Sequence, residues 1–297
     1  MTNYSLRKID RICKELKFGG FFLLVVFQIM LCSQLAFTQD NLLTIGELQK
    51  KKLYKSLDEA LQEPDKVYRL NLSNSGITQL PPEISLFKNL QSLNISLNPV
   101  SELPKEICDL KNLQWLNLRG TGISIFPADF PKLKNLTVLN LDEMTSLNVT
   151  SVLNKIFNIE NLKELSMSSV YLMSLPPQIS KLKNLEKLKL MKCGLAEVTK
   201  EIGSLKNLKY LDLSFNELSN IPPSIGILRK LEELYLGGNK LTSLPEEIVE
   251  LNESLSILGL AAPEPESGTF INNPITKDEA EKIQEWLPNT KIVFIWN

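Results

Sequence analysis

Apolar and polar positions follow one another along this chain in a pattern that recurs about every 23 residues. In each unit, aliphatic residues occupy the first, fourth and sixth positions, and polar residues stand between them. Alternation of this kind predicts a short strand with one buried face, followed by a return segment. The units begin at Val67, Leu90, Leu113, Leu136, Leu162, Leu185, Leu208, Leu231 and, in a degenerate form, Leu255.

A second motif closes many of the units. It consists of a Leu-Pro pair followed by Ile, in the segments Leu80–Ile84, Leu103–Ile107, Leu175–Ile179 and Leu244–Ile248. A single unit cannot bury its own apolar face, so neighbouring units must stack and share a core. The repetition therefore predicts one elongated domain rather than several compact ones.

With these two motifs the chain resembles bacterial leucine-rich repeat proteins whose units read L-P-x-E-I-x-x-L-x-N-L, and the resemblance covers residues 41–297. Ras-binding and plant intracellular repeat proteins share this style of unit. The resemblance implies an α/β solenoid: a leucine-rich repeat arc with a parallel concave β-sheet, a helical N-terminal cap and a helix-plus-strand C-terminal cap. It implies little about the ligand, because this scaffold serves many unrelated recognition tasks.

The ninth position of each unit is expected to turn inward, where an Asn amide satisfies backbone groups of adjoining turns. The central units depart from this pattern, because Met144 and Val170 cannot replace the amide, and the unit Leu136–Asn161 has 26 residues and lacks the Leu-Pro motif. We therefore expect less regular stacking around residues 142–161. The ninth positions hold Ser75, Asn98, Thr121, Met144, Val170, Cys193, Asn216 and Asn239.

Both ends of the repeat array carry signals for a cap. Ser56 and Glu59 form a capping-box pattern that predicts a helix from Leu57 to about Gln62, and a second such pattern begins at Thr276. The second helix is expected to bury Ala280, Ile283 and Leu287 and to precede a closing strand at Ile292–Trp296, while the Pro- and Glu-rich segment Ala261–Gly268 is expected to be an exposed loop. The predicted organisation is 1–38 leader, 39–66 N-terminal cap, 67–260 repeats, and 261–297 degenerate last repeat and C-terminal cap.

The first 38 residues have the pattern of an export signal. Five basic residues precede an apolar run, Phe18–Leu31, in which Gln28 is the one polar residue. Ala36-Phe37-Thr38 suits a signal peptidase, so the chain is expected to be exported after cleavage near Thr38–Gln39. Two alternatives stay open: an uncleaved anchor, which would be the chain's one contact with a membrane, and a lipoprotein at Cys32, which the bulky Leu31 disfavours.

Charge and residue usage argue against several classes of function. The leader carries five basic and two acidic residues of the 33 and 34 in the chain, so the remainder has 28 basic and 32 acidic residues, which argues against nucleic-acid binding. The chain has no histidine, which excludes catalysis by a His-activated nucleophile and zinc sites with histidine ligands. No catalytic residue, cofactor or metal site is expected. Cys108 and Cys193 lie four repeats apart, about 19 Å at the usual strand spacing, too far for a disulfide.

The outward strand positions are the candidate binding surface. Trp, Tyr and Arg are the residues most often found at interface hot spots, and the sequence favours two clusters, Trp115 with Arg119 and an aromatic–basic group farther along. A column of asparagines, Asn71 to Asn140, fits either a polar ligand track or a mutually hydrogen-bonded ladder, and the ladder is slightly favoured. The candidate partner-binding residues are Trp115, Arg119, Lys187, Lys189, Tyr210 and Tyr235.

These features favour a non-enzymatic recognition scaffold that binds a protein, with a glycan as the alternative ligand, through the concave face. A structural or adhesive protein of the cell envelope without a dedicated ligand is the rival interpretation. An enzyme is disfavoured, because no segment outside the repeats is long enough to form a catalytic domain.

Overall fold

The computed structural model describes residues 42–264 and 266–294. The chain divides into two units, Met1–Leu43 and Thr44–Asn297, and the second holds all the elements below. The predicted leader and cleavage point, and the last residues of the predicted closing strand, lie outside the described residues. No helix among the described residues is long and apolar enough to cross a membrane.

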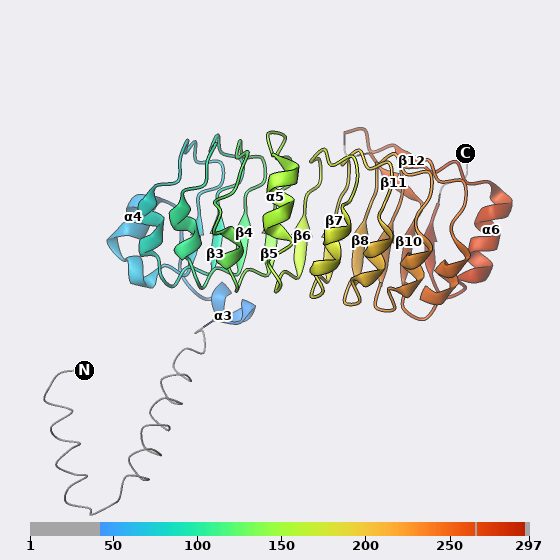
Figure 1. The fold of residues 1–297 in the computed structure, drawn as a ribbon, viewed down its shortest axis with the longest axis horizontal. Coiled ribbons are helices and arrows are strands. Elements are labelled where there is room, and N and C mark those ends of the chain that lie inside the picture. Colours follow the sequence, from blue (N-terminus) through green and yellow to red (C-terminus); the bar gives the residue numbers. More distant parts are fainter. Residues whose placement is uncertain (1–41, 265, 295–297) are drawn as a thin grey trace, which may run out of the picture. The chain divides into compact units, whose positions relative to one another are not determined.

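The described part is a solenoid built on one long parallel sheet of 11 strands (Figure 1). All strands but the last follow in chain order, and β13 pairs with β10. The predicted leucine-rich repeat solenoid is therefore confirmed. The strands are β1 (Leu53–Tyr54), β2 (Arg69–Asn71), β3 (Ser92–Asn94), β4 (Trp115–Asn117), β5 (Val138–Asn140), β6 (Glu164–Ser166), β7 (Lys187–Lys189), β8 (Tyr210–Asp212), β9 (Glu233–Tyr235), β10 (Ile257–Gly259) and β13 (Lys291–Val293).

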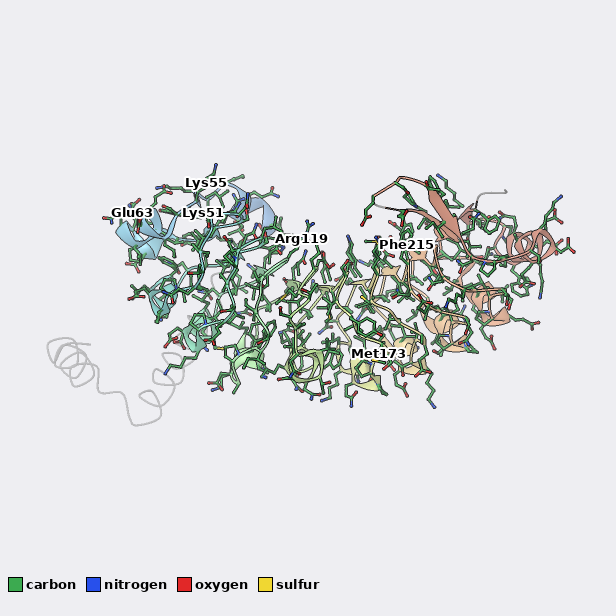
Figure 2. All side chains as sticks on the ribbon, turned by 90° about the horizontal axis from the view of Figure 1, so that it is seen from above. Lys51, Lys55, Glu63, Arg119, Met173 and Phe215 are labelled. Atoms are coloured by element: carbon green, nitrogen blue, oxygen red, sulfur yellow. The ribbon has the colours of Figure 1, made fainter. Side chains whose placement is uncertain are left out.

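The return segments form the outer side of the solenoid, and the sheet forms the inner side, on which Arg119 lies (Figure 2). Seven of the described repeats form a short 3-10 helix, and in four of them the Leu-Pro motif stands at its start. Proline suits this place because it fits the first turn of a helix and lacks the N–H that would go unbonded there. These helices are Pro82–Leu86, Lys105–Asp109, Phe130–Lys132, Pro177–Lys181, Lys200–Ser204, Pro223–Ile227 and Glu246–Leu251; a further one, Pro64–Lys66, precedes β2.

The central repeat of 26 residues replaces the 3-10 helix with an α-helix, α5 (Val149–Ile156), which the sequence pattern did not predict. Its apolar side packs Val152, Leu153 and Ile156 into the core. Through this region β4, β5, β6 and β7 keep the register found elsewhere in the sheet. The strands on either side of residues 142–161 are thus regular, and the departure from the other repeats lies in the return segment, where α5 takes the place of the 3-10 helix.

The inward asparagines bond neighbouring turns as predicted. In Asn98, Oδ1 accepts from the backbone N–H of Ser75 and Ile77 at 3.0 and 3.2 Å, and Nδ2 donates to the carbonyl of Leu72 at 2.7 Å. Cys193 takes the donor role in its own repeat, since its Sγ lies 3.2 Å from the carbonyl oxygen of Met167. Burial raises the pKa of this thiol to about 12, so it stays protonated. Both Cys108 and Cys193 are free, as expected.

At the N-terminal end the structure contains α3 (Ile45–Gln49) and α4 (Leu57–Gln62). Helix α4 matches the predicted helix, and Ser56 Oγ accepts from the Glu59 N–H at 3.2 Å, but the Glu59 carboxylate bonds the Lys55 N–H instead of completing the box at Ser56. The two-residue strand β1 was not predicted. It places the start of the sheet inside the segment assigned to the N-terminal cap.

At the C-terminal end, α6 (Lys277–Trp286) matches the predicted helix and buries Ala280 and Ile283. The segment expected to be an exposed loop is different. It forms the antiparallel hairpin of β11 (Ala261–Pro263) and β12 (Phe270–Asn272). Ala261 and Ala262 are buried, so the exposed-loop prediction is wrong for the base of the hairpin, although its tip and β12 are exposed.

The hairpin ends at Asn273, whose side chain makes the hydrogen bonds that a ninth-position asparagine makes in other repeats. Its Oδ1 accepts from the Leu241 N–H at 3.0 Å, and its Nδ2 donates to the carbonyls of Leu236 and Leu260 at 2.8 and 3.0 Å. The ninth repeat is therefore complete in structure, with the hairpin inserted between its strand and its inward asparagine. This displacement in sequence explains why the pattern looked degenerate there.

Candidate functional site

The predicted outward columns are aligned across the sheet. The register joins Trp115 to Val138, then Glu164, Lys187 and Tyr210 in the first column, and Lys189, Asp212 and Tyr235 in the second. The third column, which includes Arg119, follows each strand. Because outward side chains alternate with the inward leucines, the six candidate binding residues all belong to the inner face of the solenoid.

Four of the six candidates form one contact group, which we call the aromatic–lysine cluster: Lys187, Lys189, Tyr210 and Tyr235. The Tyr210 and Tyr235 rings lie 5.4 Å apart between centroids and are inclined at 42°. The amino groups of Lys187 and Lys189 lie 4.7 and 5.6 Å from the centroid of the Tyr210 ring. Among the described residues, neither lysine forms an ion pair with a carboxylate. The cluster thus presents two cations held by one aromatic ring.

Both phenols of the cluster stay neutral at physiological pH. Burial is the main reason that the pKa of Tyr210 is raised far above its ordinary value. Burial and the hydrogen bond to Glu233 raise the pKa of Tyr235 to about 12. The Tyr235 hydroxyl donates to Glu233 Oε2 at 2.6 Å, which fixes the ring. The two lysines therefore carry the positive charge of the cluster without compensation from phenolate.

Two glycines and the hairpin shape the C-terminal edge of this cluster. A Cβ on Gly259 would lie 2.7 Å from Cδ1 of Tyr235, so the ring occupies the space that a side chain there would need. A Cβ on Gly237 would lie 2.3 Å from the backbone nitrogen of Ala262. The hairpin β11–β12 therefore packs on the inner face directly beside the cluster. The sequence did not predict that the hairpin packs here. The break in repeat spacing after Leu260 is the one signal of it in the sequence.

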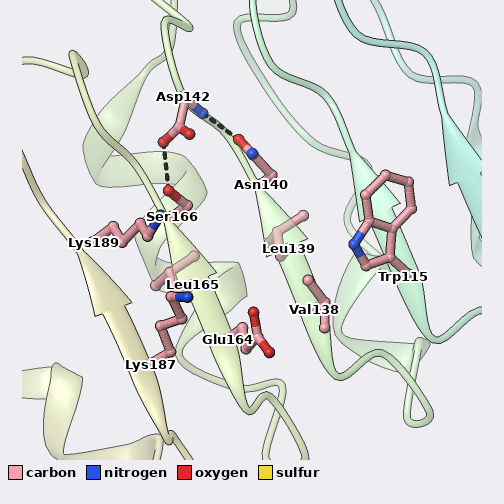
Figure 3. Close-up of a pocket in the computed structure, with 10 residues that line it drawn as sticks. All are labelled: Trp115, Val138, Leu139, Asn140, Asp142, Glu164, Leu165, Ser166, Lys187 and Lys189. Atoms are coloured by element: carbon pink, nitrogen blue, oxygen red, sulfur yellow. Dashed lines mark hydrogen bonds between the residues drawn. The ribbon is translucent and has the colours of Figure 1, made fainter. Parts of the chain in front are cut away.

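The other two candidates, Trp115 and Arg119, have separate environments. Arg119 forms an ion pair with Glu143, with Nη2 and Oε1 at 2.7 Å, which holds the pKa of the guanidinium above its ordinary value. Trp115 lies at the edge of a hollow of about 170 Å³ (Figure 3). Lys187 and Lys189 line the same hollow from the opposite side. The hollow thus connects Trp115 to the aromatic–lysine cluster.

Within the hollow, Asp142 is already bonded. Its Oδ1 accepts from Ser166 Oγ at 2.6 Å (Figure 3). The same oxygen accepts from the Ser168 N–H at 2.7 Å. These bonds stabilise the carboxylate and join β5 to β6 across the turn. Among the described residues, no group of three or more His, Cys, Asp or Glu side chains is placed to hold a metal ion.

The asparagine column is not a mutually hydrogen-bonded ladder. Each side-chain Oδ1 accepts from the backbone N–H two residues farther along its own chain: Asn71 from Ser73, Asn94 from Ser96, Asn117 from Arg119, and Asn140 from Asp142, at 2.8–3.0 Å. This arrangement is an Asx turn. The sequence slightly favoured the ladder, and that prediction is wrong.

Comparison with known proteins finds the same repeats. A family model described as leucine-rich repeat region matches residues 93–198, and one described as leucine rich repeat matches residues 183–241 and 206–262. A search of curated proteins found no match.

Several solved structures share the fold. The functional domain of InlJ from Listeria monocytogenes, whose title notes a cysteine ladder, has 20% identity and a TM-score of 0.52. That comparison covers 68% of this chain and 40% of the InlJ chain, so this chain spans less than half the length of that relative. The leucine-rich repeat domain of the type III effector XopL has 22% identity and a TM-score of 0.59, and the comparison covers 79% of each chain. A TDR receptor has 25% identity and a TM-score of 0.62, with 80% of this chain and 44% of the receptor covered.

Proposed function

Because the chain belongs to the leucine-rich repeat family, we propose that it is a non-enzymatic recognition scaffold that binds a protein partner through the inner face of its sheet. The aromatic–lysine cluster is the centre of the proposed interface, with Trp115 and Arg119 at its N-terminal side. Leucine-rich repeat domains commonly mediate protein interactions, and the extended inner face of a solenoid suits a long contact surface.

The observation that carries the proposal is the pair of lysines above Tyr210. The register places Lys187 beside Tyr210, and Lys189 is two residues farther along the same strand. Two like charges on one ring repel each other in the free protein, and an acidic group on a partner would remove that repulsion. Tyr210 and Tyr235 offer a large contact area with few rotatable bonds. Tyrosine is among the residues most often found at interface hot spots, and both lysines are partly exposed beside it.

We further propose that the chain is exported. Support comes from the basic residues before the apolar run Phe18–Leu31 and from the small-residue site that ends at Thr38. The style of the repeats supports a bacterial source. Sequencing the amino terminus of the protein isolated from its host checks the export proposal, and a soluble cytoplasmic chain that still begins at Met1 would overturn it.

The experiment for the binding proposal has two steps. The full-length protein is used to capture partners from the host, and each captured protein is then titrated against the parent protein, Tyr210→Ala and Tyr235→Ala. We expect both variants to bind more weakly. If a captured partner binds both variants as tightly as the parent, the interface lies elsewhere. If no captured protein binds in titration at all, the structural or adhesive interpretation is the better one.

A further inference from the structure

The N-terminal half of the inner face carries a second surface, distinct from the aromatic–lysine cluster. It consists of the asparagine column (Asn71, Asn94, Asn117 and Asn140) with Trp115 beside it. The strands β2 to β5 place the four asparagines in strict register, one on each strand. All four side chains are partly exposed. Their polar chemistry faces outward in a row that is free of charged side chains.

The orientation of each amide in the column is fixed. The bond from the backbone N–H two residues farther along identifies the accepting atom as Oδ1 and so places Nδ2 on the other side of the amide. Among the described residues, none of the four Nδ2 groups has a hydrogen-bond partner. The column therefore presents four preorganised N–H donors, while one lone pair of each oxygen is already in use.

A row of donors calls for a ligand that supplies acceptors. A proline-rich polypeptide is such a ligand, because each proline has a carbonyl oxygen but no backbone N–H. A sugar, whose hydroxyl groups both donate and accept, and a β-strand, whose edge presents both N–H and C=O groups, also need acceptors. On this column the acceptor left for them is the second lone pair of each Oδ1, beside an N–H that is already bonded to the same atom.

The spacing of the donors agrees with a polyproline II helix. Neighbouring strands lie about 4.8 Å apart, so every second asparagine is about 9.6 Å from the first. In polyproline II, carbonyls three residues apart point the same way and are about 9.3 Å apart, from a rise of about 3.1 Å per residue. In an extended strand, carbonyls on one side are about 6.7 Å apart, which fits neither one strand spacing nor two.

Trp115 supplies the second feature of such a site. It lies in the first column, on the same strand as Asn117, and borders the hollow that Val138 and Asn140 also line. Aromatic side chains that flank a groove are the usual partners of polyproline II segments, because the proline ring packs on the aromatic face. Trp115 thus adds apolar contact next to the donors of the column.

We propose that the asparagine column and Trp115 bind a proline-rich segment in the polyproline II conformation, lying across β2 to β5. This inference rests on the proposed function, since it assigns part of the same inner face to a polypeptide. The segment that spans the column from Asn71 to Asn140 covers three strand spacings, about 14 Å, which corresponds to about five residues of polyproline II.

The test uses a synthetic polyproline peptide long enough to cross the four strands and a glycine–serine peptide of equal length. The decisive variant is the double substitution Asn94→Asp and Asn117→Asp. Asp fits this position, because Asp212 occupies it in β8 and its Oδ1 accepts from the Ser214 N–H at 3.0 Å. The substitution therefore keeps the Asx turn and replaces the donor with an acceptor. Trp115→Ala is the second variant, and Asn289→Asp, which changes an exposed asparagine outside the sheet, is the control.

We expect the parent protein to bind the polyproline peptide and not the glycine–serine peptide, in titrations carried to millimolar peptide. Because same-facing carbonyls meet every second asparagine, the double Asp variant removes one hydrogen bond in either register and sets an acceptor against an acceptor there. It should lose at least about tenfold in affinity. Trp115→Ala should also weaken binding, and Asn289→Asp should leave it unchanged. A melting temperature of the double variant equal to that of the parent shows that the fold is intact.

Two results would overturn the inference: no binding of polyproline by the parent protein, or full binding by the double Asp variant. Equal binding of the glycine–serine peptide would also overturn it, since the surface would then not select for polyproline II. None of these results affects the proposed function, which fails instead when captured partners do not depend on Tyr210 and Tyr235.

Discussion

The ring of Tyr235 occupies the space next to Gly259 on the following strand, with the Tyr235 Cδ1 only 2.7 Å from where a Cβ of residue 259 would lie. Gly259 is buried, and its strand β10 pairs with β9 in the same register as the rest of the sheet. The absence of a side chain at this one position leaves room for the Tyr235 ring, whose hydroxyl donates to Glu233 of its own strand β9 at 2.6 Å.

The first prediction follows from this contact. Gly259→Ala should displace the Tyr235 ring. It should therefore weaken binding of the protein partner, as Tyr235→Ala is expected to do. Gly46→Ala is the control, because a Cβ at Gly46 meets nothing within 4 Å. Titration of both variants with the partner checks the result. Unchanged affinity in Gly259→Ala would show that the position of Tyr235 is irrelevant to binding.

The second prediction concerns Asn273. Removing its side chain in Asn273→Ala leaves the Leu241 N–H without its acceptor and takes one of two hydrogen bonds from each of the Leu236 and Leu260 carbonyls. The free energy of unfolding should fall by about 1–3 kcal/mol, the usual penalty for an unsatisfied buried polar group. Denaturant unfolding measures the loss, and the exposed Asn289→Ala is the control. Equal stability of the two variants would mean that the hairpin, not Asn273, closes the ninth repeat.

The comparison of Asn273 with Asn216 shows how far the sequence predicts this fold. The 23-residue period correctly places every central strand, the inward asparagines and the outward columns. It does so because stacked repeats must place an apolar residue at each inward position of the strand, which fixes the outward positions between them. The role of Asn273 was not predicted, because the hairpin separates it from its strand. Strand β1 was not predicted, because a strand of two residues is too short to show the repeat pattern. The contacts of the aromatic–lysine cluster, such as Lys187 over Tyr210, depend on side-chain rotamers and neighbouring glycines, which no periodic pattern contains.

The third prediction concerns pH. The pKa of Tyr235 is about 12 in the folded protein and about 10 in an unfolded chain. Its folded pKa is raised, so its contribution to stability is fully present below pH 10 and is lost as the pH rises toward 12. Tyr235→Phe should reduce the loss of stability over this interval. Thermal melts of the two proteins at increasing alkaline pH test this; identical pH dependence would contradict it.

The fourth prediction concerns local opening in the centre of the solenoid. Met144 and Val170 are buried where Asn98 and Asn216 bond backbone groups elsewhere. Although the strands there are regular, fewer side-chain hydrogen bonds hold the turns. Hydrogen exchange should therefore open residues 142–161 more readily than residues 208–239. Equal protection of the two segments would show that the packing of α5 replaces the missing amides.

The central claim is that the aromatic–lysine cluster binds a protein partner, and paired titrations and melts of two kinds of variant test it most directly. Tyr210→Ala and Tyr235→Ala should lose about 1–3 kcal/mol of binding free energy and keep the array folded, because both side chains point away from the core. Leu211→Ala changes the buried residue that follows Tyr210 in β8. This variant should lose about 2–5 kcal/mol of stability through the cavity it leaves. Partner affinity that is unchanged in both tyrosine variants would contradict the account.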